Sequence, residues 1–343
     1  MLGVKSNAMM TLNKKQSYGF SLVELMVAMA VGTVIIGGAF SLFSTSRDTQ
    51  KASEAQMDMV ADARFAIEMI SYDLRHAGLW GVNNRDGLIS CKSTDAPCVS
   101  TVNGDTPPTT ATNDCAVGTD PEWAFDLSRS VFATDGANPY ASTCIPGTEN
   151  YVANTDVLEV HYADANIIQP ADLLAGQTYV RSNFISGRLF VGSVAPVVAS
   201  YDTDPLTQSH QLQANAYYIS DYTDAVGDGI PSLRRASLVN GPEIRNQVLV
   251  SGVVDLQVQF GEDINNDLMI DRYVNPADVN DWSNVYAAKI WLVMQSDEQQ
   301  IGVDTEKSFE IAGAPAATYG GQDDYRYFMV TSVINLRNLK QDL

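Results

Sequence analysis

The chain has 343 residues, of which 45% are hydrophobic and 18% charged, and its 41 acidic and 21 basic side chains give a net charge of −20 at pH 7. So acidic a surface repels nucleic acid and anionic lipid headgroups, which argues against direct nucleic-acid binding. The length fits one large domain or two.

An apolar segment lies near the N-terminus, and its part from Leu25 to Phe43 contains no charged residue. As a helix this part would be roughly 28 Å long, close to the thickness of the hydrocarbon core of a bilayer. One membrane span is therefore predicted. Lys14 and Lys15 precede it, so the positive-inside rule predicts a cytoplasmic N-terminus and an exported remainder of the chain.

The cleavage signal precedes the apolar segment. In a secretory signal peptide, small residues follow the apolar run, whereas here Gly19 and Phe20 come before it. A cut between them would leave the apolar segment on the mature protein. This order resembles the class III leader of type IV pilins and of type II secretion pseudopilins, and the matching residues are Lys14, Lys15, Gly19, Phe20 and Glu24.

The resemblance implies the processing of this leader. A membrane aspartyl peptidase, the prepilin peptidase, would cut after Gly19 and methylate the new amino group of Phe20. The alternative is an ordinary membrane anchor or an uncleaved signal. Removal of residues 1–19 takes away three lysines and no acid, so the mature chain would be more acidic still.

Glu24 is the one charged residue between Phe20 and Phe43. An ionised carboxylate in an apolar region costs several kcal/mol unless it finds a partner, so such an acid points to a functional role. The resemblance to pilins supplies the partner, the positively charged N-terminus of a neighbouring subunit in the filament. The alternative is an acid that lies at the membrane interface.

The helix is predicted to continue far beyond the membrane span, because no proline occurs between Phe20 and Ala77. Gly78 is a plausible C-terminal cap. Apolar residues recur at spacings of three and four, and charged residues fall largely between them. The apolar stripe consists of Ala52, Ala55, Met59, Ala63, Ala66, Ile67, Ile70 and Leu74, and the residues assigned to the other faces are Asp48, Lys51, Glu54, Asp58, Asp62, Glu68 and Asp73.

Four parts are expected. Residues 1–19 form the leader, 20–43 the membrane and filament-core helix, 44–78 the extracytoplasmic half of the helix, and 79–343 a globular β-rich head.

A long polar region follows the helix, and residues 83–150 are rich in Asn, Asp, Thr, Gly and Pro. A loop of this length is usually functional or disordered, but its cysteines indicate order. Their even number fits disulfides formed in an oxidising compartment. Three connectivities fit the sequence and pairing of neighbours is favoured; zinc is a weaker alternative, because no Cys-x-x-Cys occurs. The cysteines are Cys91, Cys98, Cys115 and Cys144.

Strand signals accumulate in the second half of the chain. The clearest is residues 254–260, where apolar Val254, Leu256, Val258 and Phe260 alternate with polar residues. Consecutive strands without intervening helices predict an antiparallel sheet with one face covered by the helix. The fold class is therefore α+β. The other predicted strands lie within residues 156–162, 188–191, 216–219, 289–294 and 326–336.

A second resemblance covers this half. Residues 231–235, 242–244 and 248–260, followed by a late strand and a closing arginine-containing segment, resemble the minor pilins of the PilW family and the minor pseudopilin J of type II secretion. The resemblance implies a pilin-like fold and a single-pass inner-membrane protein with its head in the periplasm, which is later assembled into a pilus (fimbrium) at the cell surface. It also implies a set of partners: other minor pilins, the major pilin, a tip adhesin of the PilY1 type and the prepilin peptidase.

The function that follows is that of a minor pilin at or near the tip of a type IV pilus, which helps to initiate assembly. A head of roughly 260 residues is bulky for a subunit repeated along a filament, and it suits the tip. Twitching motility, adhesion and DNA uptake would follow by association. The alternatives are the pseudopilin J of a type II secretion system and an adhesin that uses the pilin helix as its anchor.

An acidic loop is the main candidate metal site. Asp263, Asn265, Asp267 and Asp271 occupy positions 1, 3, 5 and 9 of a pattern that resembles a calcium-binding loop. Leu268 replaces the turn glycine, and Val274 replaces the closing glutamate. Calcium and a solvated polar loop both remain as interpretations, and no cofactor is required.

No catalytic pattern is recognisable. The three histidines, His76, His161 and His210, form no metal-ligand pair and accompany no nucleophile elbow, and the chain has no phosphate-binding glycine loop. We therefore expect a structural protein and not an enzyme, with force for assembly supplied by a separate ATPase.

Overall fold

The computed structural model describes residues 19–95, 98–102, 104–118, 122–199, 206–299, 306–312, 317–320 and 325–339. Most of the predicted leader, including Lys14 and Lys15, lies outside these residues. The chain forms two compact units, Met1–Glu54 and Ala55–Leu343. The first contains the N-terminal part of one helix, and the second contains the rest of that helix together with all the strands.

In the described residues one α-helix precedes fourteen strands. The helix is α1 (Leu22–His76), and the strands are β1 (Ile89–Ser90), β2 (Val131–Thr134), β3 (Val157–Ala163), β4 (Thr178–Ser182), β5 (Gly187–Val191), β6 (Gln208–Ser220), β7 (Ser232–Val239), β8 (Glu243–Ser251), β9 (Val253–Glu262), β10 (Arg272–Val274), β11 (Val285–Gln295), β12 (Lys307–Phe309), β13 (Ala317–Tyr319) and β14 (Tyr327–Asn335). Single 3₁₀ turns lie at Asp86–Leu88, Trp123–Phe125, Gly147–Glu149, Pro170–Asp172, Pro276–Asp278, Trp282–Asn284 and Arg337–Leu339.

The helix α1 ends where the glycine cap was predicted. Gly78 has a φ of +74°, a left-handed conformation that favours glycine. Its N–H donates to the carbonyl oxygen of His161 at 3.1 Å, so the cap also fixes the end of the helix to the strand β3. A Cβ atom at Gly78 would lie 2.5 Å from Leu339 Cδ2, which leaves no room for a side chain.

The larger sheet has the order β1-β5-β4-β6-β3-β2, and β7 and β8 extend it from β6. Its centre is the long strand β6, whose residues pair with β3, β4 and β7. The pairs are antiparallel as predicted, except that β1 and β5 run parallel. Sequence patterns identified only residues 216–219 of β6, and they identified neither β7 nor β8.

A second sheet has the order β10-β9-β11-β14 and is antiparallel throughout, and β12 pairs with β13 in a separate hairpin. Leu256, Val258 and Phe260 are buried on one face of β9, as their alternation predicted. Val254 is the exception, because it packs with the hydrophobic residues of the opposite face. A register irregularity where β11 pairs with Val253 and Asp255 explains the change of face.

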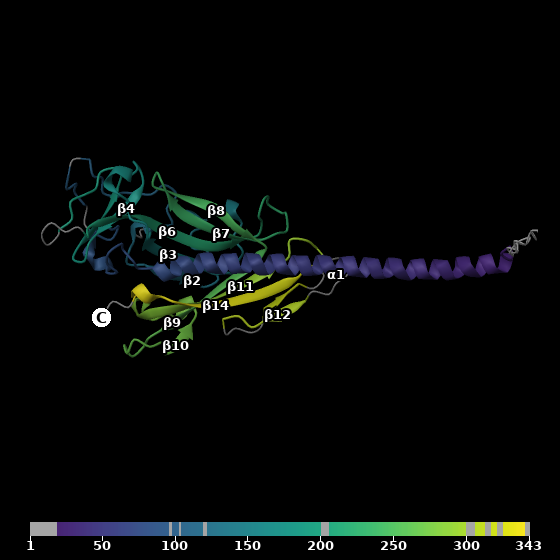
Figure 1. The fold of residues 1–343 in the computed structure, drawn as a ribbon. Coiled ribbons are helices and arrows are strands. Elements are labelled where there is room, and N and C mark those ends of the chain that lie inside the picture. Colours follow the sequence, from purple (N-terminus) through teal and green to yellow (C-terminus); the bar gives the residue numbers. More distant parts are fainter. Residues whose placement is uncertain are drawn as a thin grey trace, which may run out of the picture. The chain divides into compact units, whose positions relative to one another are not determined.

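The main core lies between α1 and both sheets. Figure 1 shows β4, β6, β7 and β8 of the larger sheet above the helix and the strands of the four-stranded sheet below it. Met59, Ala63, Ala66, Ile70 and Leu74 of α1 are buried, in agreement with the predicted stripe. Asp73, assigned to an exposed face from its charge, is instead 3% exposed.

The larger sheet is covered on both faces, not on one as predicted. Leu158 and Tyr217 point to the core under α1. Their neighbours Val157 and Tyr218 point to a second core, which is completed by residues of the polar region 83–150. Trp80, which precedes this region, belongs to the same core. The region itself contributes several buried side chains, namely Cys91, Cys115, Trp123, Phe125, Tyr140 and Ile145. Packing on the sheet therefore orders a segment that has no sequence periodicity.

Candidate functional site

The predicted cleavage junction lies immediately before α1. Phe20 is 86% exposed, and α1 begins two residues later at Leu22. The Oγ atom of Ser21 accepts a hydrogen bond from the Glu24 N–H at 3.2 Å, and Glu24 Oε2 accepts one from the Ser21 N–H at 3.4 Å. This reciprocal pair is a capping box, which satisfies two backbone donors at the helix start. Its Ser-x-x-Glu pattern is visible in the sequence, yet the sequence interpretation gave Glu24 a role in assembly and none in capping.

The capping box holds the Glu24 carboxylate beside the predicted cleavage junction. The positive end of the helix dipole also favours an anion in the first turn. A cut after Gly19 would place the new amino group at Phe20, one residue before the Ser21 N–H that Glu24 already accepts. The side chain is exposed, so it is also accessible to a cation of another molecule.

The following turns of α1 form an apolar surface without internal contacts. The helix is long and apolar enough to cross a membrane, and its most apolar window has no buried residue within the described structure. Gly32, Gly37 and Gly38 interrupt this surface, and a Cβ atom at any of them would meet nothing within 4 Å. The chain itself therefore places no steric demand for glycine at these positions.

The four cysteines form two disulfides between sequence neighbours. Cys91 pairs with Cys98, and Cys115 pairs with Cys144, with Cα–Cα distances of 5.4 and 4.8 Å. This is the pairing favoured from the sequence. No cysteine of the described residues is free.

A buried carboxylate fastens the larger disulfide loop to the sheet. Glu159 of β3 is 0% exposed and accepts hydrogen bonds from Trp123 Nε1 at 2.8 Å and from the Tyr140 hydroxyl. Burial raises the pKa of Glu159, and the Arg129 guanidinium 3.9 Å away opposes that rise. Both hydrogen-bond donors belong to the segment closed by Cys115 and Cys144. No sequence pattern predicts this contact, because it joins residues of two separate segments.

A second buried carboxylate fastens α1 to the sheet. Asp73 accepts hydrogen bonds from the hydroxyls of Tyr162 at 2.7 Å and Tyr217 at 2.6 Å, and from Asn215 Nδ2 at 2.7 Å. Burial and then the negative charge of Asp73 raise the pKa of both tyrosines, so they remain neutral donors. The three donors come from β3 and β6, and they fix the rotation of the last turns of α1 on the sheet.

Backbone N–H groups of the acidic loop donate hydrogen bonds to its carboxylates. Asp263 accepts hydrogen bonds from the N–H groups of Asn266 and Leu268, each at 2.7 Å, and Asp271 accepts one from Ile264 N–H at 2.8 Å. Leu268 has a φ of +66°, a left-handed conformation at the position where the calcium loop has glycine.

No group of three or more His, Cys, Asp or Glu side chains that could hold a metal occurs in the part of the chain that the structure describes. Calcium binding by residues 263–271 remains a prediction. A melting temperature that rises in millimolar calcium and falls again with a chelator would support it, whereas an unchanged melting curve would refute it.

The histidines engage the backbone. His161 Nδ1 lies 2.9 Å from the Arg129 carbonyl oxygen, His210 Nδ1 lies 2.8 Å from that of Asp164, and His76 Nδ1 lies 2.7 Å from that of Tyr72. Burial lowers the pKa of His161 to about 4, so this ring is neutral at pH 7. The three histidines therefore make structural contacts at three separate places in the head.

Two sequence families match parts of the chain. Residues 216–338 match the family described as Type IV Pilus-assembly protein W (PilW), and residues 14–40 match the prokaryotic N-terminal methylation motif. The chain thus carries a prepilin methylation motif that includes Gly19, Phe20 and Glu24, and a PilW domain that runs from β6 to the 3₁₀ turn after β14. No curated protein matches the chain.

Among solved structures, the chain is similar to a type IV-like pilin from Thermus thermophilus. The sequence identity is 17%, the match covers 48% of this chain and 86% of the other, and the TM-score is 0.24.

Proposed function

We propose that this chain, a type IV pilin-like protein with a PilW domain, is a minor pilin that sits at or near the tip of a type IV pilus and helps to initiate its assembly. The observation that carries the proposal is the order of features along α1. One helix begins within the N-terminal methylation motif, holds Glu24 in its first turn, presents an apolar surface and then packs into the domain that contains the PilW match. The role is structural and not enzymatic.

The assembly mechanism begins with insertion into the inner membrane. Residues 20–43 span the bilayer, the prepilin peptidase cuts after Gly19 and methylates Phe20, and the head remains in the periplasm. During assembly the Glu24 carboxylate pairs with the amino terminus of a neighbouring subunit. An unpaired acid in an apolar environment is costly, and pairing with the amino terminus offsets this cost. The pair forms only where the two groups meet, so it selects one axial position of the subunit.

Close packing of helices supplies the remaining stabilisation. Lipid tails are as apolar as leucine, so membrane helices associate through tight contact and not through the hydrophobic effect. Gly32, Gly37 and Gly38, where the chain leaves open space, would let a neighbouring helix approach closely.

The tip position follows from the bulk of the head, which comprises most of the unit Ala55–Leu343. At the tip no further subunit of the same kind has to pack above it. The partners would be other minor pilins, the major pilin and a tip adhesin of the PilY1 type. The assembled protein would be found in the pilus at the cell surface, and twitching motility, adhesion and DNA uptake would depend on it by association.

Deletion of the gene tests this function against its main alternative. The proposal predicts loss of sheared pili and of twitching, normal secretion of exported enzymes, and full recovery when the wild-type gene is restored. Intact pili with exported enzymes trapped in the periplasm would instead assign the chain as the minor pseudopilin of a type II secretion system. Intact pili and secretion with loss of surface binding alone would indicate a pilin-anchored adhesin.

A further inference from the structure

A pocket lies in the part of the head that the disulfide between Cys115 and Cys144 closes. Its volume is about 430 Å³, within the usual range of small-molecule sites, and every residue that lines it belongs to the segment from Cys115 to Cys144. Glu159 fastens that segment to β3, so the pocket walls are held in place without a ligand. The segment lies outside residues 14–40 and 216–338, so neither family match accounts for the pocket.

The guanidinium of Arg129 forms one wall of the pocket. Its Cζ atom lies 3.9 Å from the centroid of the Phe132 ring, and the Arg129 carbonyl oxygen lies 2.9 Å from His161 Nδ1, so side chain and backbone are both positioned. Its ion-pair partner Glu159 is 3.9 Å away, too far for a hydrogen bond, and no acceptor meets the guanidinium with hydrogen-bond geometry in the described part of the chain. The side chain is 33% exposed, so its planar fork of donors is open to a carboxylate.

The carboxylate of Asp126 lines the same pocket. Its Oδ1 atom accepts hydrogen bonds from the Ser128 N–H at 3.1 Å and from the Ser128 hydroxyl, whereas Oδ2 accepts none among the described residues. Asp126 is 7% exposed, and a charge so far removed from water is costly without a partner. No ion pair joins it to Arg129 within the ranges that the structure describes. The pocket therefore presents one cation and one anion that are not paired with each other.

We propose that this pocket binds a free amino acid in its zwitterionic form, with an apolar side chain. The α-carboxylate of the ligand accepts two hydrogen bonds from the Arg129 fork, and its ammonium group donates to Asp126 Oδ2. The other walls of the pocket are largely apolar, and the ligand side chain packs against Val117, Phe132 and Pro139. A few placed polar groups on apolar walls are the usual composition of a small-molecule site.

The two charges select this class of ligand. A simple anion such as phosphate would be attracted by Arg129 but repelled by Asp126, and a simple amine would meet the reverse. A neutral ligand would leave both charges unpaired and further removed from water. One end of a peptide carries only one of the two groups. A free amino acid carries both on one carbon atom, so it compensates both side chains at once.

Calorimetric titration of the full-length protein in detergent tests the site, with L-leucine and L-phenylalanine as the probes. For each probe, two matched ligands lack one charge: the N-acetyl derivative has no ammonium group, and the amide has no carboxylate. We expect saturable binding of at least one probe, with both of its matched ligands at least about tenfold weaker, equivalent to about 1.4 kcal/mol. Charge-assisted hydrogen bonds are strong enough to give this difference.

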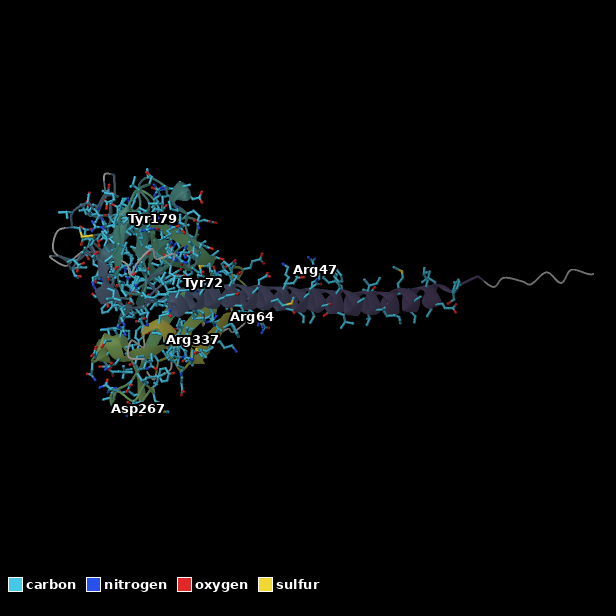
Figure 2. All side chains as sticks on the ribbon, turned by 60° about the vertical axis from the view of Figure 1, so that its left-hand side comes forward. Arg47, Arg64, Tyr72, Tyr179, Asp267 and Arg337 are labelled. Atoms are coloured by element: carbon cyan, nitrogen blue, oxygen red, sulfur yellow. A yellow bond between two sulfur atoms is a disulfide. The ribbon has the colours of Figure 1, made fainter. Side chains whose placement is uncertain are left out.

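Substitutions assign each charge to its residue. Arg129→Gln should lower the affinity at least about tenfold and remove the preference over the amide, and Asp126→Asn should remove the preference over the N-acetyl derivative. Val117→Trp enlarges a side chain of the pocket wall without touching the contacts of Glu159, so it tests the site even if the arginine variant fails to fold. The matched control is Arg64→Gln, an exposed arginine that Figure 2 shows on α1, which should leave the affinity unchanged.

Absence of saturable binding for both probes would overturn the proposal, as would binding that Val117→Trp leaves unchanged. Equal binding of the N-acetyl derivative would indicate a site for anions or peptide C-termini, and equal binding of the amide a site for amines; either result would refute a zwitterion site. The inference does not rest on the proposed function, because it concerns ligand binding by the purified protein. Gene deletion, pilus counts and secretion decide the proposed function separately.

Discussion

Three carboxylates of this chain have different roles, and the surroundings of each side chain determine its role. Glu24 lies in an exposed first turn, where it completes a capping box and keeps a charge available for a second molecule. Asp73 and Glu159 are buried and satisfied by neutral donors, so they fasten parts of the head to one another. The sequence draws attention to Glu24, because an acid in an apolar run is conspicuous, although its hydrogen bonds with Ser21 were not predicted. It concealed the other two, because Asp73 was assigned to an exposed face of the helix from its charge and the partners of Glu159 come from a separate segment.

Replacement of Asp73 by alanine should strongly destabilise the head. The substitution would leave the hydroxyls of Tyr162 and Tyr217 and the amide of Asn215 without their acceptor in a buried site. Unpaired buried donors cost 1–3 kcal/mol each, so we expect a loss of about 3–5 kcal/mol in the free energy of unfolding. Denaturant unfolding of the full-length protein in detergent measures this change.

The matched control is Asp58→Ala on an exposed turn of the same helix. It should alter the free energy of unfolding by no more than about 0.5 kcal/mol. Equal effects of the two substitutions would show that the hydrogen bonds of Asp73 do not hold the helix on the sheet.

At the scale of elements, sequence patterns identified what is periodic. The helix α1 and the strand β9 were predicted because apolar residues alternate with the period of each structure. The strand β7 was missed because serines and arginines interrupt its apolar residues. The N-terminal part of β6 was missed because it is polar. It forms a strand through its pairing with β4. The bulge at Val254 likewise depends on its partner strand.

The site was predictable to a similar degree. The methylation motif that contains Gly19, Phe20 and Glu24 could be recognised, because it is local and has fixed spacing. The attachment of residues 83–150 could not, because it depends on the Trp123 and Tyr140 side chains meeting Glu159 from a separate segment. Long-range contacts of this kind have no signature in one sequence.

The two disulfides should contribute unequally to stability. Cys115 and Cys144 are 29 residues apart, whereas Cys91 and Cys98 are seven apart. A cross-link stabilises mainly by restricting the unfolded chain, more so for the longer loop. Replacement of both Cys115 and Cys144 by alanine should cost about 2–4 kcal/mol, and about 1 kcal/mol more than the same replacement of Cys91 and Cys98.

Denaturant unfolding of the two double variants provides the comparison. A larger loss for Cys91→Ala with Cys98→Ala would contradict the chain-entropy account and would indicate that the shorter loop holds the local packing.

At the scale of the whole molecule, buried acids should make the head more stable at mildly acidic pH. Burial raises the pKa of Asp156 to about 7, and burial together with nearby Glu122 raises that of Asp114 to about 7. Both acids ionise in the unfolded chain near pH 4. Over the interval between pH 4 and 7 the folded state therefore binds more protons, so the free energy of unfolding falls as the pH rises.

His161 has the opposite effect on the free energy of unfolding. Burial lowers its pKa to about 4 from an ordinary 6.5, so between these pH values the unfolded state binds one proton that the folded state does not. The two acids outweigh it. We expect a lower free energy of unfolding at pH 8 than at pH 5, and a pH dependence reduced in Asp156→Asn. Chemical unfolding of both proteins at the two pH values measures this, and a wild-type stability that increases towards pH 8 would contradict it.

The central claim, that Glu24 acts through its charge in assembly, is tested most directly by the recovery of two variants in sheared pili. Glu24→Gln keeps a side-chain acceptor for the Ser21 N–H but removes the charge, and Ser21→Ala removes one bond of the capping box but keeps the charge. Both variants should be inserted into the membrane and cut.

The account predicts that recovery of Glu24→Gln falls at least about tenfold, since loss of the pair leaves the neighbour's amino terminus without its counter-ion, while Ser21→Ala stays near the wild-type level. Recovery of Glu24→Gln at the wild-type level would contradict it. So would an equal loss in both variants, because helix capping and not charge would then be the contribution of this turn.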